Sequence, residues 1–220
     1  RAQGLRQGAS NALTVVGGAY HWMGAVFAGL LMRALPALLN DHGVDGNLAN
    51  VFFGFALWLG MLPPLFAYFG TMRFGWRLGV EPVFVPRTTA LAICAAYFVA
   101  LLFGFLSGAV VARWMAITYD ASQSLGRCLA LMAIVGAPLA VGSVVHLYPH
   151  GFFNILVLVP VLIWCMYLLY RGLPIVLGTG PNRGMLMASA LIAYLFAAFV
   201  SLLGITVALW GSGIGPLIGA

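Results

Sequence analysis

The sequence has very few charged residues and no lysine at all. Charged residues make up 6% of the 220 residues, whereas a soluble domain carries about 25%. All ten basic residues are arginine, and only four residues are acidic. A chain of this composition cannot build a water-facing surface, so most of it must lie in lipid. The few positive charges lie between apolar runs, where arginines set the orientation of a membrane protein in the bilayer. They are therefore not expected to bind nucleic acid.

The sequence also lacks the patterns of common active sites. None of the five apolar runs that are named below as membrane spans carries Asp, Glu or Arg in its interior, where an ion-coupled transporter usually needs such a group. It contains no H-E-x-x-H, no Cys/His cluster and no G-x-S-x-G. Cys94, Cys128 and Cys165 form no C-x-x-C and are expected to be small buried apolar residues. We therefore predict no catalytic residues, no metal and no cofactor.

Long apolar runs dominate what the chain does contain. A helix needs about 20 apolar residues to cross a bilayer. The runs of this length are Val51–Met72, Thr88–Ala112, Cys128–Val145, Phe152–Tyr170 and Met185–Trp210. The third and fourth are joined by a short break and form the hairpin around which the others are placed. The predicted fold is an all-α, polytopic transmembrane helix bundle with five core spans, which occupies residues 51–220. An N-terminal region of residues 1–50 precedes it.

A further apolar segment, Ala12–Met32, is either an interfacial helix or a sixth span, since its glycines weaken helix propensity. If this segment does not cross, seven of the ten arginines fall on one side of the membrane and three on the other. If it crosses, the arginines divide five against five. The uneven division is the stronger signal under the positive-inside rule. It favours five spans, a cytoplasmic N-terminus and a C-terminus outside.

Three local features qualify this picture. Pro63 and Pro64 lie in the middle of the first span and predict a kink or break in its helix. Asp120 and Gln123 fit a capping box at the start of the third span. Two spans also carry a small residue at every fourth position, which lets another helix approach closely and makes these residues candidates for helix packing or partner contact. They are Gly104, Gly108, Ala112 and Ala193, Ala197, Ser201.

Part of the chain resembles a known family of small membrane proteins. The resemblance rests on AITYDASQS (Ala116–Ser124), RCLALMAIVGAPLAVGSVVHLYP (Arg127–Pro149), MYLLYRGLPIVL (Met166–Leu177) and GTMRFGWRLG (Gly70–Gly79). These stretches are similar to the bacterial branch of the Yip family, the Rab-interacting-protein type of multi-spanning protein. The resemblance implies five spans and a cytoplasmic N-terminal region. It implies a helper role rather than a reaction, because eukaryotic members are associated with small GTPases and vesicle traffic, and it transfers no catalytic residues.

Our leading hypothesis is a non-catalytic integral membrane protein of the bacterial inner membrane, acting as a scaffold, assembly factor or accessory subunit. Its expected partners are the lipid bilayer and either other membrane-protein subunits or further copies of itself. One alternative is a transporter or channel for a small solute or lipid that uses a break at Pro63 and Pro64. Another is a subunit that binds haem between His21 and His146, or quinone beside Trp58 and Trp164. Ser107, Ser143 and Ser201 are expected to bond to their own helices or across helix contacts.

Overall fold

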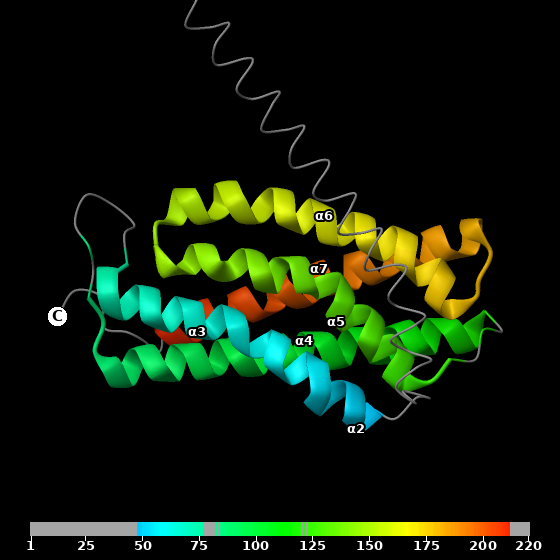
Figure 1. Ribbon diagram of the computed structural model, residues 1–220, viewed down its shortest axis with the longest axis horizontal. Helices are drawn as coiled ribbons and strands as arrows, with labels where there is room; N and C mark the ends of the chain where they lie inside the picture. Colours follow the sequence, from blue (N-terminus) through cyan, green and yellow to red (C-terminus); the bar gives the residue numbers. More distant parts are fainter. Residues whose placement is uncertain (1–47, 77–81, 83, 120, 122, 212–220) are drawn as a thin grey trace, which may run out of the picture. The chain divides into compact units, whose positions relative to one another are not determined.

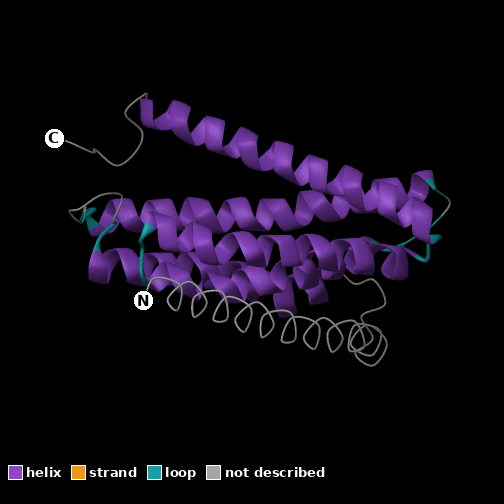
Figure 2. Cartoon of the chain, turned by 90° about the horizontal axis from the view of Figure 1, so that it is seen from above, coloured by secondary structure: helices purple, strands orange, loops and turns teal. Residues whose placement is uncertain are grey.

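The computed structural model describes residues 48–76, 82, 84–119, 121 and 123–211, all of which belong to the compact unit Val44–Ala220. Ala12–Met32, His21 and Asp120 lie outside the described residues, so the predictions made for them stay predictions. Every regular element described is a helix (Figures 1 and 2). The elements are α2 (Leu48–Val51), η1 (a π-helix, Phe52–Ala56), α3 (Leu57–Phe74), α4 (Arg87–Thr118), α5 (Leu125–Gly142), η2 (a 3₁₀-helix, Ser143–Leu147), α6 (Gly151–Leu177) and α7 (Pro181–Gly211).

The five predicted spans are confirmed as helices long and apolar enough to cross a membrane. They cover Phe52–Phe74, Arg87–Thr118, Leu125–Leu147, Gly151–Leu177 and Pro181–Ala208. In hydrocarbon no water is present to bond the backbone, so each segment must satisfy its own amide and carbonyl groups, which a helix does. Most of the spans extend past the predicted apolar runs. The additional turns contain arginines and polar residues, which the apolar runs exclude and which belong at the membrane surface.

Helix α5 is the centre of the bundle. In its most apolar window 61% of the residues are buried, against 6–28% in the other spans. It packs against α2, α3, α4 and α6 (Figure 1). Small residues in α5 allow this central position, because Ala130, Ala133 and Gly136 leave room for neighbouring helices to approach. The most extensive of these contacts joins α5 to α6, the hairpin expected from the sequence.

The first span corrects one prediction. Helix α3 runs without interruption through Pro63 and Pro64, and both rings are buried within the bundle. Each proline leaves the carbonyl four residues earlier without its usual partner, a loss that neighbouring helices tolerate in a membrane protein. The departure from α-helical geometry lies earlier, in the π-helical turn Phe52–Ala56. The helix is therefore not broken at the prolines, and the kink predicted there stays a prediction.

The start of α5 differs from the predicted capping box. The N-cap is Ser124, whose side chain accepts a hydrogen bond of 3.3 Å from the amide of Arg127. Gln123, expected to act inside the box, instead accepts a bond of 3.1 Å from the Arg127 guanidinium. The helix therefore begins at Leu125, after the stretch in which the box was predicted. At the end of α6, Gly178 takes a left-handed conformation with φ 67°, which glycine adopts at little cost.

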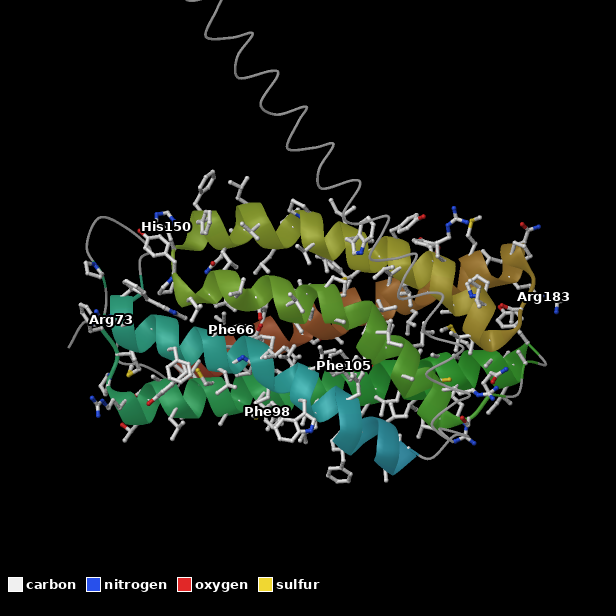
Figure 3. The ribbon with its side chains drawn as sticks, viewed as in Figure 1. Phe66, Arg73, Phe98, Phe105, His150 and Arg183 are labelled. Atoms are coloured by element: carbon white, nitrogen blue, oxygen red, sulfur yellow. The ribbon has the colours of Figure 1, made fainter. Side chains whose placement is uncertain are left out.

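The two ends of the bundle differ in how tightly they are packed. We call them the Arg183 end and the Arg73 end, after residues labelled in Figure 3. The α4–α5 and α6–α7 connections lie at the Arg183 end, and the α3–α4 and α5–α6 connections lie at the Arg73 end (Figure 1). The buried residues of α6 all lie in its second half, near the Arg183 end: Cys165, Leu168, Leu169, Gly172, Leu173 and Leu177. Those of α7 lie in its first half, near the same end: Gly184, Met187, Ala188 and Leu191. Helices α6 and α7 are thus enclosed by their neighbours near the Arg183 end and exposed toward the Arg73 end.

Candidate functional site

The small residues of α4 are used mainly inside the bundle. Ala112 is fully buried, and Gly108 lies where α4 meets both α5 and α7. A Cβ built on Gly108 would lie 2.8 Å from the Met132 methyl carbon and 3.5 Å from Leu195 Cδ2. Gly104 differs, because no atom lies within 4 Å of the same position. The geometry thus gives Gly108 and Ala112 a packing role and leaves Gly104 open.

The small residues of α7 have no such role within the chain. Ala193, Ala197 and Ser201 are all exposed, and they form a smooth stripe along the helix. The Ser201 hydroxyl donates a hydrogen bond of 2.8 Å to the carbonyl of Ala197, so it is satisfied by its own helix. This stripe is available to another helix.

The second half of α7 is exposed on nearly all sides. From Phe196 to Ala208 no residue is buried, and only Ala198 and Leu202 are partly covered. Figure 2 shows α7 lying beside the bundle near its start and diverging from it toward its C-terminal end. The large side chains left exposed there are Phe196, Phe199, Val200, Leu203, Ile205 and Val207. We call Phe196–Ala208 the free half of α7.

The first half of α7, in contrast, is fixed to α6. A side chain on Gly184 would overlap with the Pro174 ring, so the two helices approach closely there. One turn deeper, the hydroxyls of Tyr170 and Ser189 share a hydrogen bond of 2.9 Å. These two contacts hold α7 at the Arg183 end, and its other end is left to diverge.

Aromatic side chains gather at the Arg73 end. Tyr148 lies at the centre of this group, with ring centroids 5.9 Å from Phe74, 6.2 Å from His150 and 6.3 Å from Phe153. The rings of Tyr148 and His150 are stacked, and the other pairs meet edge to face. Aromatic rings are enriched at membrane surfaces, where an apolar body and a polar edge are both satisfied. The group therefore joins α3 to the α5–α6 connection at that surface.

The polar groups of the bundle serve mainly local structure. Ser107 and Ser143 donate to carbonyls three residues earlier, so with Ser201 all three serines bond along their own helical segments, as predicted. The cysteines are free thiols; Cys128 and Cys165 are buried as predicted, and Cys94 is half-buried. Within the described residues, no three His, Cys, Asp or Glu side chains are grouped to hold a metal ion. His146 has the ring of Tyr97 at 6.4 Å as its aromatic neighbour.

Several of these contacts were not predicted from the sequence. Tyr170 and Ser189 carry no pattern that marks them as a pair, because their meeting depends on the register of α6 against α7. Nor does the sequence mark Gly184 as the point where α7 packs on Pro174. The divergence of α7 gives no sequence signal either, because a residue that faces lipid and a residue that faces another helix are equally apolar.

Comparison with known proteins identifies the family. Residues 37–202 match the Yip1 domain. The chain is 31% identical over 158 residues to the inner membrane protein YohC of Escherichia coli strain K12, which covers 71% of this chain and 81% of the relative. The protein of the same name from Escherichia coli O6:H1 strain CFT073 matches to the same extent. No solved structure matches. The resemblance inferred from the sequence is confirmed: the chain belongs to the Yip1 domain family and is an integral protein of the inner membrane.

Proposed function

We propose that this inner-membrane protein is a non-catalytic scaffold or accessory subunit that docks another transmembrane protein against α7. The observation that carries the proposal is the free half of α7. From Phe196 to Ala208 the helix has no buried residue, so this half of the span lacks the packing that holds the first half of α7 to the bundle. A second protein helix beside it restores that packing.

The chemistry of α7 favours a protein helix over lipid alone. Lipid tails are as apolar as leucine, so burial of apolar surface does not drive helix association in a membrane. Close backbone approach does, because it multiplies van der Waals contacts, and small residues permit it. The stripe of Ala193, Ala197 and Ser201 offers that approach and is exposed. The large side chains of the free half flank this stripe and provide the surrounding contacts.

The alternative of a solute or lipid transporter has less support. It was based on unwound backbone at Pro63 and Pro64, whose carbonyls would line a path. Helix α3 is continuous through both residues, and both are buried. The haem alternative required His21, which lies outside the described residues, and the quinone alternative gains no observation at Trp58, which is 59% exposed.

The proposal is tested by filling the stripe without disturbing the fold. In the double variant Ala193→Leu/Ala197→Leu, two exposed small residues become large. The matched control is Ala95→Leu/Ala96→Leu, which makes the same change on an exposed part of α4. Each protein is purified in mild detergent from its native membrane, and the co-purifying proteins are quantified.

We expect both variants to fold with unchanged thermal stability, and only the α7 variant to lose its partner. If the protein is recovered as a dimer, the partner that docks on α7 is a second copy of the same chain. A wild-type protein recovered consistently as a monomer with no partner contradicts the proposal. Equal loss of the partner in the α4 control contradicts the role of α7.

A further inference from the structure

We infer that the Arg183 end binds the headgroup phosphates of anionic phospholipids. Each of the four helices α4–α7 carries one arginine close to this end of the bundle: Arg113, Arg127, Arg171 and Arg183. At the Arg73 end the described residues contain two, Arg73 and Arg87. We call the four residues the arginine belt.

No carboxylate of the described residues neutralises the belt, because none of those residues is Asp or Glu. Arg127 bonds to the neutral side chain of Gln123 at 3.1 Å. Arg113, Arg171 and Arg183 are exposed. Four guanidinium groups at one membrane surface create a positive field, and the anion available there at high density is the lipid phosphate.

The length of α6 places the belt at headgroup depth. The hydrocarbon core is crossed by about 20 helical residues. Counted from Gly151 at the Arg73 end, the twentieth residue of α6 is Tyr170, and Arg171 follows it. Arg171 therefore lies where hydrocarbon gives way to phosphate, and the last turns of α6, to Leu177, continue into the headgroup layer. Helix α4 likewise continues past Arg113 to Thr118.

The side chain of Arg171 lies over one aromatic ring. Its guanidinium carbon lies 5.7 Å from the centroid of the Tyr167 ring, a cation–π distance. Tyr167 in turn contacts Trp164, with ring centroids 5.6 Å apart. Aromatic rings of this kind mark the interfacial layer. The ring contacts the face of the guanidinium, whereas its N–H donors point outward along its edge. The donors therefore stay free to bond phosphate oxygens.

Arg183 and Arg171 lie close enough in depth for their side chains to reach the same headgroup layer. Because Gly184 packs on Pro174, these two positions are level across the α6–α7 pair. Arg171 lies three residues deeper than Pro174 along α6, and Arg183 lies one residue above Gly184 along α7. At 1.5 Å per residue their backbones differ in depth by about 6 Å, which two long side chains can cover. An open hollow of about 390 Å³, lined by Gly180, Pro181, Asn182 and Arg183, leaves room for a headgroup beside Arg183.

The test compares the two ends of the bundle at equal charge. The double variant Arg171→Gln/Arg183→Gln removes two charges from the belt, and the matched control Arg73→Gln/Arg87→Gln removes two from the other end. The full chain is placed in nanodiscs of mixed phosphatidylglycerol and phosphatidylcholine, and the lipid retained after extraction into detergent is measured by native mass spectrometry. An arginine near an anionic surface contributes about 1 kcal/mol, so we expect the belt variant to lose roughly 30-fold in preference for phosphatidylglycerol. The control should retain most of that preference.

Two further measurements keep the outcome decisive. Arg171→Lys/Arg183→Lys should restore part of the preference, which a variant that fails for structural reasons would not do. Circular dichroism confirms that each variant is helical. Equal loss in both double variants, or no preference for phosphatidylglycerol in the wild-type protein, overturns the inference. Displacement of the lipid by inorganic phosphate or by an acidic peptide also overturns it, because the belt would then serve a soluble anion or a protein partner.

Discussion

Gly70 of α3 lies directly against the backbone carbonyl of His146 in η2, with no room for a side chain between them. A Cβ built on Gly70 would overlap with that oxygen and would lie 2.9 Å from the carbonyl oxygen of Leu147. The obstacle is backbone, so no side-chain rotation relieves it. This contact sets how closely the end of the first span approaches the α5–α6 connection.

Replacing Gly70 by alanine should therefore destabilise the bundle. Overpacking typically costs about 1–3 kcal/mol, and a clash with backbone belongs at or above the upper part of that range. Gly104→Ala is the matched control, because a Cβ there meets nothing within 4 Å. It should be neutral or stabilising by up to about 1 kcal/mol, the helix propensity difference. Thermal unfolding in detergent, followed by circular dichroism, measures both.

A second prediction concerns the two halves of α7. Leu191 is fully buried, whereas Leu203 is 49% exposed. Leu191→Ala should destabilise the protein by about 2 kcal/mol or more, because it leaves a cavity where the first half of α7 packs on the bundle. Leu203→Ala should change the free energy of unfolding by less than about 0.5 kcal/mol. Equal effects of the two substitutions in denaturant titrations of the purified monomer would show that the free half of α7 is packed after all.

The hydrogen bond between Tyr170 and Ser189 allows a third prediction. Hydrogen bonds between membrane helices contribute about 0.6 kcal/mol on average and about 1.7 kcal/mol at most. A double-mutant cycle of Tyr170→Phe and Ser189→Ala should give a coupling energy in that range. A coupling energy of zero would mean that the two hydroxyls do not hold α6 to α7.

A fourth prediction concerns orientation. If the end with more arginines faces the cytoplasm, the Arg183 end lies inside and the Arg73 end outside. In a variant lacking Cys94, Cys128 and Cys165, a cysteine introduced at Pro82 should react with a membrane-impermeant thiol reagent added to intact cells. A cysteine introduced at Asn182 should react only after the cells are opened. Both positions are exposed at opposite ends of the bundle, and the reverse labelling pattern would invert the topology.

The sequence was sufficient to predict the class of fold and the number of spans. Apolar length and the near-absence of charge decide both, because hydrocarbon tolerates little else. The six described arginines also fall at the ends that the five-span count assigns them, four at the Arg183 end and two at the Arg73 end. The family followed from the linker and hairpin residues within Arg113–Gly178.

The sequence was less informative about local geometry. Proline in water usually interrupts a helix, but Pro63 and Pro64 are buried and α3 continues through them. The small residues of α4 and of α7 look alike as patterns, yet Gly108 is enclosed by Met132 and Leu195 while Ala197 is exposed. Which stripe is covered depends on the register and tilt of whole helices. Those follow from many packing contacts, and no single spacing in the sequence encodes them.

The most direct test of the proposed function is photo-crosslinking from α7 in the native membrane. A photoreactive amino acid placed at Ala197 probes the exposed small-residue stripe, and one placed at Ile163, which is 62% exposed on α6, is the control for lipid-facing surface. We predict a discrete protein adduct from position 197 and only lipid adducts from position 163. Lipid adducts alone from both positions, in cells grown under several conditions, would contradict the proposal that α7 docks a protein.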